Sequence, residues 1–213
     1  KTVMSDPQNT SDARQYDMSS LRVCTFCAEP VSPAVQQFGM ELMSPQYINS
    51  YWATEHGGIV WTHFYGNEDF PLRPDAHTYP LPWIAGEVWV LEGGDREAAG
   101  TEAPRYRIAD YEEKGEIVIT APYPYLTRTI WGDVKGFEAW VAALQGGNGA
   151  AAPRWRGDAE RFIKTYWRRG PNGEWGYVQG DFAMKYPDGS FTLHGRSDDV
   201  INVSGHRMGT EEI

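Results

Sequence analysis

The hydrophobic pattern of the first fifty residues indicates a strand, a helix and a second strand. Residues 1–20 are polar and predict an irregular segment. Residues 21–27 alternate as in a buried strand, and Ser32 followed by Pro33 is typical of a helix start, with apolar residues at helical spacing behind it. Residues 46–52 predict the second strand. The order strand, helix, strand favours a parallel βαβ unit.

The loops that follow these two strands are candidates for a binding site. Ligands of a parallel sheet gather beyond the C-terminal ends of its strands. In this chain those ends are Ala28-Glu29-Pro30 after the first strand and Thr54-Glu55 after the second.

Beyond residue 70 the pattern changes to short strands separated by Pro and Gly. Strands are predicted at residues 86–92, 115–120, 177–186 and 190–194, with a hairpin turn at Pro187-Asp188-Gly189. Two helices interrupt them, at residues 136–144 and 158–168. On the second helix we expect one apolar face, made by Phe162, Ile163 and Tyr166.

These elements predict a mixed α/β and α+β fold, in which a βαβ portion is followed by a small antiparallel β-sheet or barrel. We expect residues 1–70 to be the end of an α/β subdomain and residues 71–195 to form a β-rich subdomain with a helical insertion. Residues 196–213 combine arginines, adjacent aspartates and glycines. That mixture suits neither a core strand nor a surface helix and indicates a hinge with ligand contacts.

Composition and charge exclude some classes of partner and indicate a cellular location. The chain has 213 residues and a net charge of -10, which argues against nucleic acid as a partner because such binding needs a basic face. No apolar run has the length of a membrane span, so no membrane partner is expected. Cys24 and Cys27 lie three apart on a predicted strand and face opposite sides, so we expect two unpaired thiols and a cytoplasmic location.

Several motifs, in the right order, resemble the adenylate-forming acyl-CoA synthetases. They are the run from Tyr51 to Gly58, Gln179-Gly180-Asp181, and the run from Gly195 to Asp199. The sequence from Asn202 to Arg207 is similar to the hinge sequence of the acetyl-CoA synthetase branch. The resemblance extends from about residue 21 to residue 213, and it implies an AMP-forming acid-thiol ligase that uses a small carboxylic acid, ATP, Mg²⁺ and CoA.

The resemblance also implies a role for each motif residue. The adenine would be lined by Ala28, Glu29 and Pro30 and by the edge Asn49, Ser50 and Tyr51. Thr54 would bind phosphate, and Glu55 would hold Mg²⁺, which prefers carboxylate oxygens. Asp181 would accept the two ribose hydroxyls, supported by Arg196.

In the hinge segment the implied roles concern conformational change. Asp198 resembles the residue about which a C-terminal domain rotates, and Arg207 would approach the phosphates during adenylation. Gly205 would lie on the path of the CoA thiol, and Ser204 would contact the CoA nucleotide. Trp52 would close the acyl pocket and so restrict the substrate to small acids.

Departures from the family pattern suggest a specialised subgroup. Ala53 replaces a usual glutamine, and a helix is inserted between Gly132-Asp133 and Arg161-Phe162. These features look like the ligase part of propionyl-CoA synthases, which activates 3-hydroxypropionate. Acetate, propionate, acrylate and 3-hydroxypropionate all remain candidate substrates.

The chain also lacks two family motifs, the upstream phosphate loop and the lysine beyond the hinge. We therefore expect a fragment that lacks the N-terminal and C-terminal parts of its polypeptide and is inactive alone. Two alternatives stay open: an adenylating domain that loads a carrier protein, and a non-catalytic nucleotide-binding module. Each motif residue taken alone is compatible with a purely structural role, as is Trp52 at a strand end.

Overall fold

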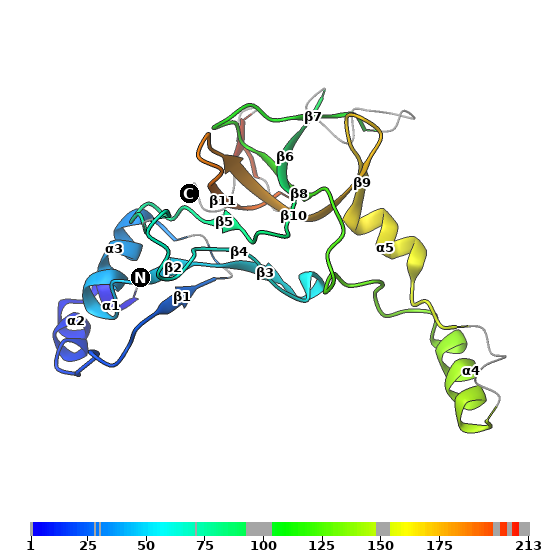
Figure 1. Ribbon diagram of the computed structural model, residues 1–213, viewed down its shortest axis with the longest axis horizontal. Helices are drawn as coiled ribbons and strands as arrows, with labels where there is room; N and C mark the ends of the chain where they lie inside the picture. Colours follow the sequence, from blue (N-terminus) through cyan, green and yellow to red (C-terminus); the bar gives the residue numbers. More distant parts are fainter. Residues whose placement is uncertain are drawn as a thin grey trace.

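A computed structural model describes residues 2–27, 29, 31–70, 72–92, 104–147, 154–197, 201–203 and 206–208. The helices are α1 (Thr2–Ser5), α2 (Pro7–Ala13), α3 (Pro33–Leu42), the 3-10 helix η1 (Thr54–His56), α4 (Val134–Gln145) and α5 (Ala159–Tyr166). The strands are β1 (Cys24–Phe26), β2 (Tyr47–Asn49), β3 (Tyr51–Ala53), β4 (Gly58–Thr62), β5 (Tyr79–Pro80), β6 (Gly86–Leu91), β7 (Tyr106–Ile108), β8 (Gly115–Ile119), β9 (Trp167–Arg169), β10 (Trp175–Lys185), β11 (Phe191–Arg196), β12 (Ile201–Val203) and β13 (His206–Met208). Figure 1 shows α1 to α3 at one end, the larger sheet in the middle, and α5 leading to an outlying α4 at the other end.

Residues 2–5 and 7–13 are helical, so the prediction of an irregular segment over residues 1–20 was wrong for them, while residues 14–20 are irregular as predicted. Pro7 stands at the start of α2, where its missing N–H costs nothing. The side chain of Asp6 caps the helix by accepting hydrogen bonds from the backbone of Gln8, at 2.8 Å, and of Asn9, at 3.4 Å. Local capping thus outweighs the polar composition.

The parallel βαβ unit is confirmed. β1 and β2 pair in parallel, with Cys24 opposite Tyr47, and α3 connects them from its N-cap, Ser32. The expected buried strand over residues 21–27 is shorter, however, because only residues 24–26 form the strand and only Phe26 is buried. Both cysteines are free thiols, as predicted.

The second predicted strand is divided between two sheets. β2 belongs to the parallel pair, whereas β3 joins β4 and β5 in an antiparallel sheet. The division falls at Ser50, whose N–H still bonds to the Phe26 carbonyl but whose hydroxyl lies 2.9 Å from Thr62 Oγ1 on β4. Tertiary hydrogen bonds therefore redirect the chain at this residue.

The predicted antiparallel sheet is confirmed. Its order is β11-β10-β8-β6-β7, and β9 pairs with β10. The turn predicted at residues 187–189 joins β10 to β11, with Gly189 at φ +81° and its N–H bonded to the Tyr186 carbonyl. That positive φ is readily adopted only by glycine.

One apolar core joins the smaller antiparallel sheet to the larger one. Val60 and Trp61 of β4 are fully buried together with Ile117 of β8 and Phe191 of β11. The Trp61 and Phe191 rings pack edge to face with centroids 5.5 Å apart. This core therefore holds β4 of the smaller sheet against β8 and β11 of the larger one.

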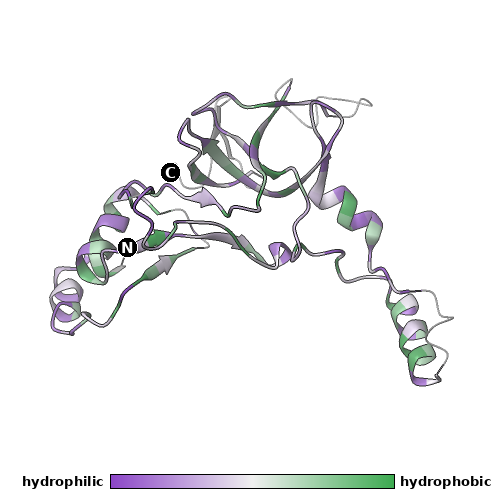
Figure 2. Ribbon diagram, viewed as in Figure 1, coloured by the Kyte–Doolittle hydropathy of each residue, from purple (hydrophilic) through white to green (hydrophobic). Residues whose placement is uncertain are grey.

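The inserted helices differ in how they pack. α4 has no buried residue although most of its residues are apolar, and it lies apart from the sheets (Figure 2). α5 is attached through Phe162, which is buried, while Ile163 is exposed. The prediction that Ile163 shares the apolar face of Phe162 is therefore wrong, since α5 buries Phe162 and leaves Ile163 exposed. None of the described helices is long and apolar enough to cross a membrane.

Candidate functional site

A tight turn positions the first candidate residue, Glu55. η1 connects β3 to β4, and Gly57 ends it at φ +76°. A Cβ on Gly57 would come within 2.0 Å of the Tyr125 carbonyl oxygen, so only glycine fits there. Glu55 also accepts a backbone hydrogen bond from Thr127, at 3.0 Å.

Two side chains from other elements hold the Glu55 carboxylate. The hydroxyl of Tyr166, at the end of α5, donates to Glu55 Oε1 at 2.9 Å. Gln179 Nε2, on β10, donates to Glu55 Oε2 at 3.2 Å. The Tyr177 hydroxyl in turn donates to Gln179 Oε1 at 2.7 Å and fixes the orientation of that amide. Each carboxylate oxygen of Glu55 is therefore tied to a separate part of the fold.

A second carboxylate, Asp181, lies two residues further along β10. It stands opposite Arg196 of β11 at a point where the strand register shifts. Arg196 Nη1 lies 3.5 Å from Asp181 Oδ1 and donates to the Gln179 carbonyl at 3.1 Å. The Tyr51 hydroxyl, from β3, donates to Asp181 Oδ2 at 2.5 Å.

The two carboxylates are thus joined in one hydrogen-bonded network. Gln179 links Glu55 through its side chain and Arg196 through its backbone, and Arg196 contacts Asp181. Residues more than 120 positions apart in the sequence are brought together in this way.

His56 fills the space behind this network. Its side chain is only 1% exposed and packs edge to face against Tyr51 and Tyr177. Burial lowers the pKa of His56 to about 4, although the neighbouring Glu55 charge favours protonation. Its Nδ1 has no hydrogen-bond partner among the described residues. The imidazole is therefore neutral and acts as a spacer between the two tyrosines.

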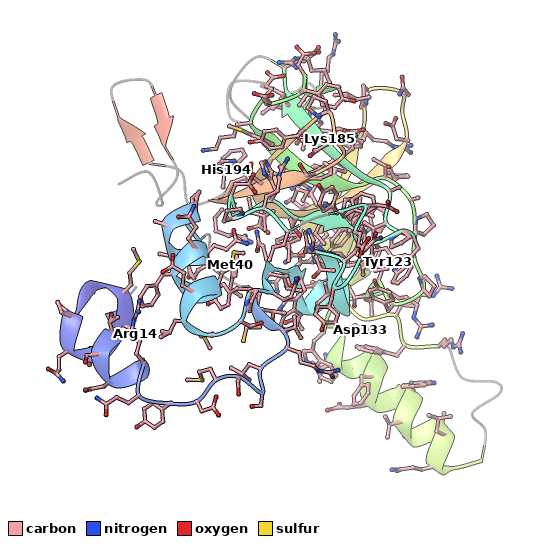
Figure 3. The ribbon with its side chains drawn as sticks, turned by 60° about the vertical axis from the view of Figure 1, so that its left-hand side comes forward. Arg14, Met40, Tyr123, Asp133, Lys185 and His194 are labelled. Carbon is pink, nitrogen blue, oxygen red and sulfur yellow. The ribbon has the colours of Figure 1, made fainter. Side chains whose placement is uncertain are left out.

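Tyr123 closes the network on the side of the larger sheet. It lies where side chains of the two antiparallel sheets crowd together (Figure 3), and its hydroxyl donates to the His56 carbonyl at 3.1 Å. Burial raises the pKa of Tyr123 and of Tyr177, so both phenols are protonated donors at neutral pH.

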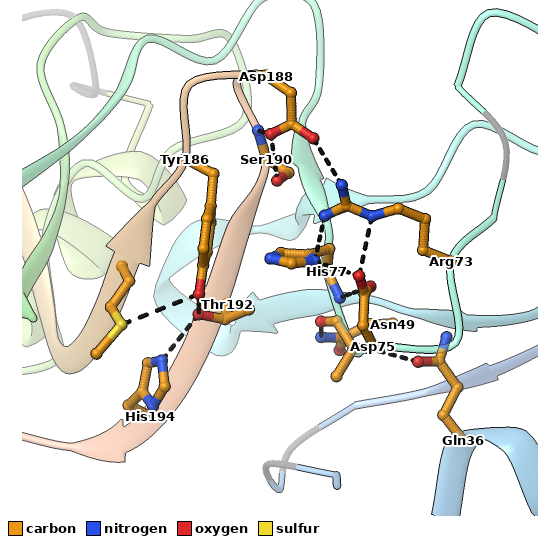
Figure 4. A network of polar contacts seen from close by, with 12 residues as sticks. Gln36, Asn49, Arg73, Asp75, His77, Tyr186, Asp188, Ser190, Thr192 and His194 are labelled. Carbon is orange, nitrogen blue, oxygen red and sulfur yellow. Dashed lines mark hydrogen bonds and ion pairs between the residues drawn. The ribbon is translucent and has the colours of Figure 1, made fainter. Parts of the chain in front are cut away.

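Asn49 and Ser50 point into the protein. Asn49 is 5% exposed, and its amide donates to the Ala76 carbonyl at 2.8 Å. Arg73 and Asp75 belong to the same loop, and Figure 4 shows Arg73 reaching Asp188 of the β10–β11 turn, at 2.9 Å. The side chains of Asn49 and Ser50 are thus used in packing and hydrogen bonding within the fold.

The other predicted residues are exposed, lie in the β12–β13 pair or fall outside the described residues. Trp52, on β3, is 46% exposed, and Thr54, next to Glu55 in η1, is exposed. Glu29 is an exposed bend residue, and Arg207 is paired with Asn202 in the β12–β13 hairpin. Those outside the described residues are Ala28, Pro30, Asp198, Ser204 and Gly205.

Sequence reasoning missed Tyr166 and the side chain of Gln179 as parts of the site. Gln179 could have been found, because it belongs to the same short motif as Asp181, Gln179-Gly180-Asp181. Tyr166 gave no such indication, since its place at the end of α5 depends on how the insertion packs.

The donor set suits a metal ion that is shared with a ligand. No cluster of three or more potential ligands is found among the described residues. Glu55 offers a single carboxylate, and Mg²⁺ is often bound by one or two carboxylates together with substrate phosphates. Glu55 therefore fits that role, and Asp181, beside Arg196, fits the binding of hydroxyl groups.

Comparison with known proteins gives consistent matches. The family described as AMP-binding enzyme matches residues 2–131, more than half of the chain. An acetyl-coenzyme A synthetase of Pyrobaculum aerophilum is 32% identical over 203 residues, covering 94% of this chain and 24% of the relative. One from Helicobacter pylori is 30% identical and covers 95% of this chain and 25% of the relative. The chain therefore spans about a quarter of the length of these relatives.

Solved structures agree at the level of the fold. The anthranilate CoA ligase AuaEII, in complex with anthranoyl-AMP, matches with a TM-score of 0.55 at 20% identity, over 94% of this chain and 30% of that one. The ATP-bound RpMatB-BxBclM chimera B3 matches with a TM-score of 0.56 at 14% identity, over 89% and 28%.

Proposed function

The chain belongs to the AMP-binding enzyme family, and we propose that it is part of an ATP-dependent, AMP-forming acyl-CoA synthetase. The complete enzyme would activate a short-chain carboxylate as an acyl-adenylate and then transfer the acyl group to CoA. We propose that residues 1–70 and 71–195 are two subdomains of its large domain and that residues 196–213 lead to a further domain. The two free thiols suit a reducing cytoplasm.

The observation that supports this function most strongly is the connection between Glu55 and Asp181. An enzyme that adenylates a carboxylate must hold the ribose and the phosphates of one nucleotide at the same time. Gln179 and Arg196 link the two carboxylates into one rigid unit.

At the nucleotide, we propose that Asp181 accepts hydrogen bonds from the ribose hydroxyls while Arg196 holds it in place. The exposed Thr54 binds a phosphate oxygen. Ala28, Glu29 and Pro30 line the adenine together with the backbone of residues 49–51, because the side chains of Asn49 and Ser50 are turned inward.

Glu55 would hold Mg²⁺, which supplies positive charge against the phosphates. The protein's own contribution is to keep the Glu55 carboxylate in one orientation. Tyr166 and Gln179 do this from opposite sides, at 2.9 and 3.2 Å.

For the hinge segment we propose the roles that the family resemblance implies. Asp198 is the pivot, and Arg207 contacts phosphate in the adenylating state. Gly205 allows the CoA thiol to pass, and Ser204 contacts the CoA nucleotide.

The acyl pocket is closed by Trp52, whose large ring would leave room for small acids only. Its 46% exposure leaves the ring accessible to a substrate. Among small acids we favour 3-hydroxypropionate, because Ala53 is smaller than the glutamine usual in the acetyl enzymes and leaves room for a hydroxyl group.

The test is an ATP-dependent thioester assay on the complete polypeptide with acetate, propionate, acrylate, 3-hydroxypropionate and hexanoate. We expect AMP, pyrophosphate and a CoA thioester from the acids of two or three carbons. The Asp181→Ala variant should lose most of this activity, and Tyr186→Phe, in the β10–β11 hairpin, should keep it. Transfer to a carrier protein but not to CoA would favour the carrier-loading alternative, and failure to bind ATP would refute the proposal.

A further inference from the structure

Tyr51 was expected to line the adenine, and its hydroxyl makes a separate contact within the protein. It donates to Asp181 Oδ2 at 2.5 Å, a short distance typical of a bond to an ionised carboxylate. The two residues come from different sheets, since Tyr51 lies on β3 and Asp181 on β10. The bond therefore depends on the tertiary fold and is not a local accident of one strand.

The Tyr51 ring is fixed in this orientation. It packs edge to face against His56, with centroids 5.3 Å apart, and against Trp61, at 5.8 Å. Both neighbours are at most 1% exposed, so the ring has little room to turn. Burial, and then the Asp181 charge, raise the pKa of Tyr51 well above its usual value. The phenol is thus a donor throughout the range in which an enzyme works.

Asp181 is consequently held from two directions. Tyr51 contacts Oδ2, and Arg196 contacts Oδ1 at 3.5 Å. The two oxygens of a carboxylate have four lone pairs that can accept hydrogen bonds, and these lie in the plane of the group. Rotation of that plane therefore decides which lone pairs face a ligand. A neighbouring pair of hydroxyls can bond to both oxygens only when the plane is correctly set.

We infer that Tyr51 is a positioning residue that sets ribose recognition by orienting the Asp181 carboxylate. The inference rests on the proposed function and extends it to the selectivity of the enzyme for ribose over deoxyribose. Loss of the Tyr51 hydroxyl would remove the contact at Oδ2 and leave that at Oδ1, so the carboxylate plane would be held less firmly and the contribution of the ribose hydroxyls would decrease.

The experiment compares ATP with 2′-deoxy-ATP in the complete polypeptide. Tyr51→Phe retains the ring that packs against His56 and Trp61, so we expect it to fold with a melting temperature near that of the wild type. Its KM for ATP should rise about tenfold, as for loss of one hydrogen bond to a charged group, with kcat nearly unchanged. Its preference for ATP over 2′-deoxy-ATP should fall severalfold. Tyr186→Phe removes a hydroxyl in the β10–β11 hairpin and should leave that preference unchanged.

A double-mutant cycle shows whether Tyr51 acts through Asp181. Asp181→Asn should itself reduce the preference for ATP, and adding Tyr51→Phe should reduce it no further. Equal losses for the two nucleotides in Tyr51→Phe, additive effects in the double variant, or tighter ATP binding would each overturn the inference. An active wild type with an unaltered Tyr51→Phe variant would refute only this inference, whereas a wild type without ligase activity would refute the proposed function.

Discussion

Removing the Tyr166 hydroxyl tests whether Glu55 must be held in one orientation. In Tyr166→Phe the donor 2.9 Å from Glu55 Oε1 is lost, and Gln179 remains as the other side-chain donor. Hydrogen bonds to charged groups contribute about 1.5–3 kcal/mol. Both residues are partly exposed, so we expect the lower end, about 1.5 kcal/mol, which corresponds to roughly a tenfold loss in kcat/KM.

The assay is pyrophosphate release by the complete polypeptide at several Mg²⁺ concentrations. We expect the Mg²⁺ concentration for half-maximal rate to rise, because a loosely held Glu55 carboxylate is a poorer ligand. Gln179→Met should behave in the same way, and combining both changes should cost more than either alone. Tyr186→Phe is the matched control. Unchanged Mg²⁺ dependence in both single variants would refute the idea that these two donors position Glu55.

Three further predictions concern His56, Gly57 and Trp52. The pKa of His56 is lowered by burial from 6.5 to about 4, so the folded state binds this proton less tightly than the unfolded state does. The contribution of His56 to the free energy of unfolding is therefore fully present above pH 6.5 and decreases by up to about 3 kcal/mol as the pH falls towards 4. His56→Gln should flatten the pH dependence of the melting temperature across that window. Gly57→Ala should lower the melting temperature strongly, because the added Cβ would collide with the Tyr125 carbonyl. Gly66→Ala, at a similar φ of +72° and with no described atom within 4 Å, should lower the free energy of unfolding by only about 1 kcal/mol. Equal losses in the two variants would contradict the predicted collision. Trp52→Gly should extend the substrate range of the ligase to acids of six or more carbons, and an unaltered acid profile would remove Trp52 from the acyl pocket.

The elements with strong local patterns were predicted well. The parallel pair β1–β2 and the hairpin at residues 187–189 are confirmed because each is encoded within a short stretch, by a helix start at Pro33 and by a turn glycine at Gly189. The strand over residues 46–52 was wrong as one element. Its division at Ser50 depends on a hydroxyl contact with Thr62, which no local pattern reveals.

The candidate site was predictable only in part, for a similar reason. Glu55 and Asp181 could be proposed from motifs, because their surroundings in the sequence are distinctive. The donors that hold them come from distant elements: Tyr51 reaches Asp181 across 130 positions, and Tyr166 reaches Glu55 across 111. Tyrosine at the end of a helix or strand is common, so its partner becomes visible only in the folded chain.

Gln179 gives the site a property that neither carboxylate has alone. Its side chain bonds to Glu55, its carbonyl accepts from Arg196, and its amide is oriented by Tyr177. A shift of β10 relative to η1 would therefore disturb Glu55 and Asp181 together, since Gln179 bonds to Glu55 directly and is connected to Asp181 through Arg196. In the proposed enzyme such a link would keep the ribose and phosphate contacts at a fixed separation. Because positioning errors of about 1 Å can cost a hundredfold in rate, this fixed spacing would itself contribute to catalysis in the proposed enzyme.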